Sequence, residues 1–432
     1  MGVAPHTGIF HDMRLAKVSL RSSLLRYLNI SYVNMKHNTQ WLVLIICGLS
    51  LSVQGCGDPV QKAMDYCASQ ASLTLESVPS VDKIPNSVFK DSRQWNYTSP
   101  GNWTSGFWPG QLWYLFEGTG DAKWKEAASA VTEQIIPVAY RKARNHDMGF
   151  ITMPSIGNAY RLTGNERYKE ALVSAADSLI CLYNPTVGTT MSWPNMVSRM
   201  NWPHNTIIDN MMNLELLFWV AENADRPDLY AIAHRHAEVT MKHQFREDYS
   251  TYHVMVFDPS DGHFISGHTH QGWKDESTWA RGQAWAIYGF TMAYRFTKDE
   301  RFLDTAVKAA DFFLNNLPED MVPFWDFDAG KELPEQPKDC SASAIAASAL
   351  LEMQSYLPED LSEYYMDKAI KMVEAMSNPP YRAGDQCSAF LLHCTGHMPK
   401  GGEVDASISY AEYYYLEAII RLQRMLLGKE IV

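Results

Sequence analysis

The sequence has no run of basic residues. Of its 432 residues, 37 are Lys or Arg and 49 are Asp or Glu, so the formal net charge is -12. A protein that binds nucleic acid needs clustered cations to displace counterions from phosphates. The composition therefore argues against a nucleic-acid partner, and an anionic ligand would have to be held by a few local cations.

No Pro-, Ser- or Gly-rich linker divides the chain after residue 57. With 46% hydrophobic and 20% charged residues, the composition is that of a globular protein with a large core. We therefore expect residues 56–432 to form a single domain.

Cysteine is too irregularly spaced for a disulfide framework or a zinc site. Seven are present, and two of them, Cys47 and Cys56, lie in or directly after the N-terminal apolar segment described below. The odd number that remains favours buried free thiols, with a Cys387–Cys394 pair as the alternative. These five are Cys67, Cys181, Cys340, Cys387 and Cys394.

The alternating pattern of a β-strand is scarce, and helical periodicity takes its place. Apolar residues recur at intervals of three and four in six segments, at residues 110–116, 156–162, 213–221, 283–296, 342–356 and 411–426. The sequence therefore predicts an all-α protein.

A repeated sequence pattern, typical of helical hairpins, connects these segments. Residues 114–124 (YLFEGTGDAKW), 160–168 (YRLTGNERY) and 294–302 (YRFTKDERF) each end one helix, make a tight turn and begin another. Alanine-containing helices follow, around residues 126–131, 171–179 and 306–314. Six such hairpins can close into an (α/α)6 barrel with long loops at its mouth, and an open superhelix is the alternative.

The N-terminal region resembles a bacterial lipoprotein signal peptide. A short positive start at Met35 is followed by an apolar run over residues 41–53 and then by Gly55 and Cys56. We expect residues 35–55 to be the signal, residues 1–34 to lie outside the natural product, and Cys56 to be lipidated. The protein would then be an exported periplasmic or outer-membrane lipoprotein of a bacterium, held to the membrane only by its lipid. An ordinary cleaved signal or a core segment are the alternatives.

Residues 267–290 (GHTHQGWKDESTWARGQAWAIYGF) concentrate His, Gln, Arg and Trp in one loop and helix start. Aromatic faces stack on sugar rings, and a guanidinium forks onto a carboxylate, so this mixture suits an acidic sugar. The 13 Trp and 22 Tyr of the chain agree with carbohydrate chemistry. A Trp-rich helix start packed under a loop is the structural alternative.

Two acids stand out. Asp147 follows His146, and Asp209 lies in the apolar text Ile207-Ile208-Asp-Asn-Met211-Met212. Burial disfavours the charged form of a carboxylate, so the pKa of each should rise, and Asp209 is the better candidate for holding a proton. Either side chain could instead cap a helix.

Several motifs in order resemble glycoside hydrolase family 88, the unsaturated glucuronyl hydrolases, over residues 58–425. The motifs are residues 103–110 (WTSGFWPG), 146–150 (HDMGF), 208–212 (IDNMM), 268–272 (HTHQG), 277–285 (STWARGQAW) and 410–417 (YAEYYYLE). The resemblance implies an (α/α)6 barrel, in agreement with the hairpin pattern.

The resemblance also implies roles for individual residues. Asp209 would be the principal acid/base and Asp147 the second catalytic acid. The pocket would be lined by Trp103, His146, Trp193, His253, His270, Gln271, Arg281, Trp285 and Tyr410. The sequence matches the family pattern less well at residues 393–402 (HCTGHMPKGG) and 406–409 (ASIS). Lys400, in the first of these segments, is a candidate contact for the leaving sugar.

The expected activity is removal of a 4,5-unsaturated uronic acid from the non-reducing end of lyase-generated, glycosaminoglycan-type oligosaccharides. The chemistry would be acid/base-catalysed hydration of the C4=C5 bond. An unsaturated rhamnogalacturonyl hydrolase and a non-catalytic glycan-binding lipoprotein are the alternatives. No cofactor or metal is expected, because His268 and His270 lack a nearby third ligand in the sequence.

Overall fold

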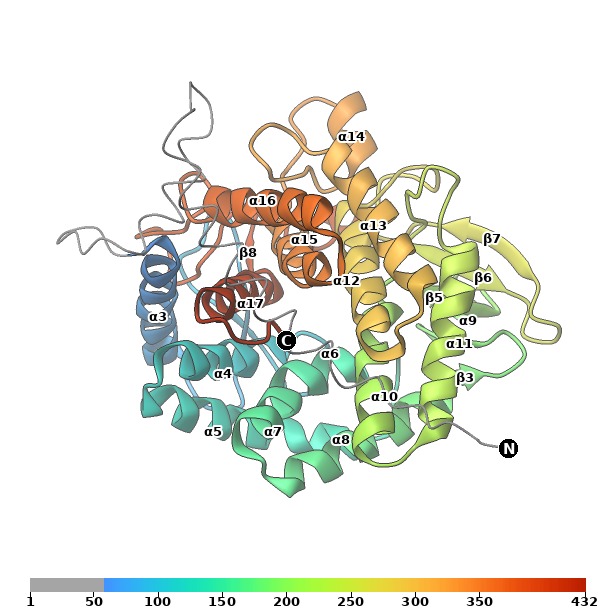
Figure 1. Cartoon of the computed structure of the whole chain (residues 1–432), viewed down its shortest axis with the longest axis horizontal. Coiled ribbons are helices and arrows are strands. Elements are labelled where there is room, and N and C mark those ends of the chain that lie inside the picture. The colour runs from blue at the N-terminus through green and yellow to red at the C-terminus, as the bar shows by residue number, and fades with distance from the viewer. Residues whose placement is uncertain (1–57) are drawn as a thin grey trace, which may run out of the picture. The chain divides into compact units, whose positions relative to one another are not determined.

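Two concentric rings of helices build the part of the chain that the computed structural model describes, residues 58–432 (Figure 1). The inner ring consists of α4 (Phe107–Thr119), α6 (Met148–Thr152) continued by a π-helical turn (Met153–Gly157) and α7 (Asn158–Thr163), α10 (Asn210–Asn223), α12 (Ala280–Thr297), α15 (Cys340–Met353) and α17 (Ser409–Leu426). The outer ring consists of α3 (Pro59–Ser77), α5 (Ala122–Ala139), α8 (Glu166–Leu179), α11 (Pro227–His243), α13 (Glu300–Asn315) and α16 (Glu359–Met376). The predicted (α/α)6 barrel is confirmed, and the six periodic segments of the sequence lie in the inner helices.

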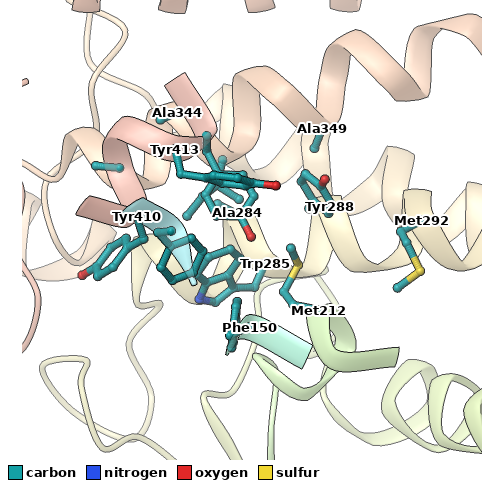
Figure 2. Packing of buried hydrophobic residues seen from close by; sticks show 14 of the residues in the cluster. Phe150, Met212, Ala284, Trp285, Tyr288, Met292, Ala344, Ala349, Tyr410 and Tyr413 are labelled. Carbon is teal, nitrogen blue, oxygen red and sulfur yellow. The ribbon is translucent and has the colours of Figure 1, made fainter. Parts of the chain in front are cut away.

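Inner and outer helices differ in how they are buried. Every residue of α15 is buried, as is α12 from Ala280 to Ala293, because these helices touch both ring neighbours and outer helices. The Ala and Ser residues of α15 permit this close packing. Outer helices bury only one face, as α13 does with Phe302 and Phe313. Figure 2 shows Trp285 and Tyr288 of α12 packed with Tyr410 and Tyr413 of α17.

Helix-capping residues explain the turn sequence that is repeated in the three hairpins. Asp121, Asn165 and Asp299 each accept a hydrogen bond from the backbone N–H two residues later, which begins the outer helix. The preceding residues, Gly120, Gly164 and Lys298, adopt left-handed φ values of 72°, 65° and 54° and end the inner helix. The three predicted hairpins are therefore confirmed.

Short strands, which the sequence did not predict, lie in the loops between helices. They are β1 (Ile84–Val88), β2 (Asn96–Thr98), β3 (Tyr183–Asn184), β4 (Thr189–Thr190), β5 (His204–Ile207), β6 (Val254–Phe257), β7 (Phe264–His268) and β8 (Ser407–Ile408). Segments of two to five residues are too short to show alternation. The antiparallel β5-β6-β7 sheet aligns Ile207 with Val254 and Val254 with His268.

Five cysteines of the described residues are free thiols. Cys67, Cys340 and Cys394 are buried as expected, whereas Cys181 is exposed, and a Cys387–Cys394 disulfide is absent, so that alternative was wrong. Among helices of residues 58–432, none has the length and apolar character to cross a membrane. The predicted signal at residues 35–55, Cys56 and residues 1–34 lie outside the described residues.

Smaller helical pieces connect these elements. They are α9 (Met196–Arg199), α14 (Phe327–Glu332) and the 3-10 turns Ile180–Leu182, Gln354–Tyr356 and Met398–Lys400. The last of these turns carries Lys400 beside the site described next.

Candidate active site

Asp209 lies two residues after the end of strand β5, at the N-cap position of α10. Its side chain makes no capping hydrogen bond, unlike those of Asp121, Asn165 and Asp299 at the starts of α5, α8 and α13. The residue is 8% exposed, and its Oδ2 has no hydrogen-bond partner within the described residues. Burial raises the pKa of Asp209 to about 6, with Asp147 adding to the rise and His146 and Arg281 opposing it. The capping alternative is therefore wrong for Asp209.

Asp147 occupies the same position on α6 and likewise makes no capping hydrogen bond. The Asn145 amide donates to its Oδ2, and His146 Nε2 lies 3.3 Å from its Oδ1. Burial raises the pKa of Asp147 to about 7, against the lowering effect of Asn145. Two buried carboxylates with raised pKa values thus lie close enough to influence each other, an arrangement that suits acid/base chemistry.

His253 connects the β-sheet to this pair. The Ile208 N–H donates to the His253 carbonyl at 3.1 Å, so the sheet places the imidazole beside Asp209. Its Nε2 lies 3.7 Å from Asp209 Oδ2. Burial lowers the pKa of His253 far below its usual value and that of His146 to about 4, so both rings are neutral at pH 7.

Aromatic rings surround the polar groups. Trp193, half-buried, lies 6.2 Å from His146, 5.8 Å from His253 and 5.2 Å from His270, measured between ring centroids. Trp103 lies 5.1 Å from Tyr410. The structure therefore gathers predicted pocket residues from six positions between residues 103 and 410, with flat faces suited to a sugar ring.

The loop at residues 393–402 closes one side of the site. Gln271 Nε2 donates to the Gly396 carbonyl at 3.1 Å, which ties the loop to the residues after β7. Lys400 Nζ lies 3.0 Å from His270 Nε2, so the exposed ammonium faces the site. The His397 ring lies 5.0 Å from that of His270, and both its ring nitrogens are buried without a partner in the described residues.

Comparisons with known proteins agree with this geometry. Residues 75–424 match the model of Glycosyl Hydrolase Family 88. The chain belongs to this family. It is therefore a glycoside hydrolase, and the similar proteins carry more specific names.

An unsaturated glucuronyl hydrolase of Formosa agariphila is 41% identical over 331 residues, which cover 76% of this chain and 81% of that protein. An unsaturated chondroitin disaccharide hydrolase of Streptococcus pneumoniae is 33% identical over 332 residues, or 74% and 82% of the two chains. A crystal structure of an unsaturated glucuronyl hydrolase specific for heparin superposes with a TM-score of 0.80 at 36% identity, covering 86% of this chain and 98% of that one.

The guanidinium of Arg281, which is expected to contact the substrate, binds protein acceptors in this family 88 protein. Its Nη1 donates to Asp339 Oδ2 at 2.9 Å and to the Thr395 carbonyl at 2.6 Å, and its Nη2 donates to the Gly396 carbonyl at 2.5 Å. The fork expected on a substrate carboxylate is engaged by protein acceptors, and the side chain is 1% exposed. Arg281 thus holds the 393–402 loop and lowers the pKa of Asp209, and its contact with a substrate stays a prediction.

Trp285, which is expected to line the pocket, has a fully buried ring. Its centroid lies 5.2 Å from that of Phe150, which Figure 2 shows beside it, and 5.4 Å from that of Tyr414. Its indole Nε1 is buried and has no partner within the described residues. Its contact with a ligand stays a prediction. An aromatic on a fully buried inner helix packs first into the core.

Sequence reasoning missed Asn145, Asn213 and His397. Asn145 donates to the carboxylate of Asp147, Asn213 contacts His146, and His397 lies in the 393–402 loop, where the sequence suggested no role for it. Amides give no chemical signal in a sequence, so only the contacts identify them. His268, considered for zinc, instead bonds Asp275 and Ser266, each at 2.8 Å. The absence of a metal stays a prediction, as do the catalytic roles of Asp209 and Asp147.

Proposed function

We propose that this enzyme removes the 4,5-unsaturated uronic acid from the non-reducing end of oligosaccharides left by polysaccharide lyases. The observation that carries the proposal is Asp209, a buried carboxylate with an unpartnered oxygen and a pKa of about 6. A pure binding protein would gain little from a carboxylate placed toward an anionic sugar. The names of the relatives support a glycosaminoglycan-derived substrate.

The chemistry follows from the substrate's enol ether. Asp209 gives its proton to C4, and the positive charge that forms at C5 is shared with the ring oxygen. Water adds to C5 and returns a proton to Asp209, with Asp147 as the second acid of the site. The resulting hemiketal opens to a 5-keto chain, and C1, now a hemiacetal, releases the next sugar. Proton transfer of this kind contributes about 10²–10⁴-fold to a rate.

The leaving sugar would meet the 393–402 loop. His270 and His397 present neutral rings there, because burial, reinforced by Lys400, lowers the pKa of each to about 4. The Lys400 ammonium would contact a sulfate or carboxylate of this sugar, and the unpartnered nitrogens of His397 would contact its hydroxyl groups. This assignment makes the loop the determinant of which glycan is accepted.

A panel of unsaturated disaccharides tests the proposed function. The purified protein is mixed with chondroitin-, hyaluronan-, heparin- and pectin-derived unsaturated disaccharides, and loss of the ultraviolet absorbance of the enol ether is followed. We expect turnover of at least one glucuronyl disaccharide. Turnover of the rhamnogalacturonyl compound alone would favour the pectin alternative, and binding without any turnover would leave only a glycan-binding protein.

We also propose that the chain is exported as a lipoprotein through residues 35–55 and Cys56. The pattern of positive start, apolar run and Gly55-Cys56 supports this. Mass spectrometry of the N-terminal peptide, after expression of the full chain in a bacterium, should find an acylated Cys56. An intact peptide spanning residues 50–60 would contradict the proposal, and a Cys56→Ser variant serves as the unacylated control.

A further inference from the structure

The two histidines that face the catalytic carboxylates both have their Nδ1 occupied. His253 Nδ1 accepts hydrogen bonds from the backbone N–H groups of His270 and Gln271, at 3.1 and 3.2 Å. A backbone N–H can only donate, so this nitrogen carries no proton. His146 Nδ1 lies 3.1 Å from the side-chain nitrogen of Asn213.

The orientation of the Asn213 amide is fixed by a second contact. Its Oδ1 accepts from the Phe150 N–H at 2.9 Å, and because that group can only donate, the oxygen must be at this end. The NH₂ end therefore faces His146 and makes Nδ1 an acceptor. Gly149 permits the approach, since a Cβ built there would lie 2.6 Å from Asn213 Cα.

A neutral imidazole has one N–H, so in both rings it is on Nε2. These are the nitrogens that face the acids, at 3.3 Å from Asp147 Oδ1 for His146 and 3.7 Å from Asp209 Oδ2 for His253. Each carboxylate thus has the Nε2–H of one neutral histidine beside it. The donors reach the site from the loop before α6 and from the residue before β6, and each is held from behind by groups that can only donate.

We propose that Asn213 is a positioning residue that fixes His146 as the Nε2–H tautomer, as the backbone after β7 fixes His253. After the acid has given its proton to the substrate, a neutral N–H can donate a hydrogen bond to the resulting carboxylate. A fixed positive charge would instead ionise the acid before the substrate arrives. The tautomer itself follows from contacts alone. Its effect on turnover rests on the proposed function.

The tautomer is measured by nitrogen NMR of the full chain labelled with ¹⁵N-histidine, without substrate. His146 is assigned by comparison with a His146→Gln protein. We expect Nδ1 of His146 to give an acceptor-type signal and Nε2 a protonated one. The opposite pattern in the wild-type protein would overturn the proposal, whatever any variant does.

Asn213→Asp supplies the causal test, because a carboxylate would accept a proton from Nδ1. We expect the Nδ1 signal to move to the protonated range and kcat to fall at least about 10-fold with little change in KM. Asn158→Asp is the matched control, since Asn158 is a buried amide that bonds Pro154, Tyr413 and Arg161 and neither histidine. It should leave the His146 signals and the ratio of kcat to KM unchanged.

The outcomes separate the two proposals. A wild-type protein that turns over no unsaturated disaccharide fails the proposed function, while the NMR signals still report the tautomer. A switched tautomer with unchanged kcat would overturn the positioning role. If Asn213→Asp does not fold, Asn213→Ser, which removes the fixed amide donor, should give a mixture of both tautomers, and an unmixed Nε2–H signal would contradict the role of Asn213.

Discussion

Asp209 Oδ2 lies 3.7 Å from His253 Nε2, and neither atom has a hydrogen-bond partner within the described residues. Leaving a buried polar group unpaired costs about 1–3 kcal/mol, so such groups are rare away from functional sites. Trp285 Nε1 and the ring nitrogens of His397 share this state. Buried atoms elsewhere, such as Trp108 Nε1 and Glu412 Oε2, are also unpartnered, so this state points to a ligand only together with the other features of the site.

Asp209→Asn is expected to keep the fold and lower turnover of an unsaturated disaccharide by at least about 10²-fold. The amide preserves shape but cannot deliver the proton. Asp121→Asn is the matched control, because Asp121 caps α5 and an Asn side chain can cap equally well. Residual activity above a tenth of wild type, measured by loss of enol-ether absorbance, would rule out Asp209 as the acid.

The same substitution should stabilise the protein at high pH. The folded-state pKa of Asp209 is about 6, above its ordinary value of 3.8, so the cost of ionising the buried group grows as pH rises between these values and is complete above about 6. We expect Asp209→Asn to raise the free energy of unfolding at pH 8 by on the order of 2–3 kcal/mol and to have little effect near pH 4. Urea unfolding at both pH values measures this.

Asp147→Asn should likewise raise the free energy of unfolding at high pH. For this residue the gain should be complete above about pH 7, where the pKa of Asp147 lies. A loss of stability at pH 8 in both variants would show that these carboxylates are hydrated rather than desolvated.

Arg281→Lys is expected to loosen the 393–402 loop. One ammonium cannot reach Asp339, the Thr395 carbonyl and the Gly396 carbonyl together, so we expect a loss of about 1–3 kcal/mol in unfolding free energy and a higher KM. Arg167→Lys, at an exposed pair with Glu133, should change neither quantity. Wild-type stability together with a raised KM would instead favour direct contact between Arg281 and the substrate.

Lys400→Ala should weaken the hydrolysis of sulfated disaccharides and leave unsulfated ones unchanged. Lys400 is exposed and lies 3.0 Å from His270, so its attraction to a sulfate should shrink as salt is added. The control is Lys371→Ala, which removes an exposed lysine from the outer helix α16. Equal effects on both substrates, or none on either, would remove Lys400 from the leaving-sugar subsite.

The sequence by itself determined the helical hairpins, the ring of six inner helices and the two acids. Helical periodicity and capping residues such as Asp121 depend on residues within about four positions of one another in the chain, so the sequence alone reveals them. The ordered motifs identified the family for the same reason. The short strands could not be predicted in this way, because segments of two to five residues are too short to show alternation.

Only the tertiary structure decided how the site residues are used. Arg281 and its partners Asp339 and Gly396 are far apart in the chain, and closure of the ring brings the guanidinium onto protein acceptors. Burial of α12 takes Trp285 into the core. The contacts of Asn213 and His253 fix which nitrogen carries a proton, because a tautomer depends on the donors and acceptors that folding places around a ring.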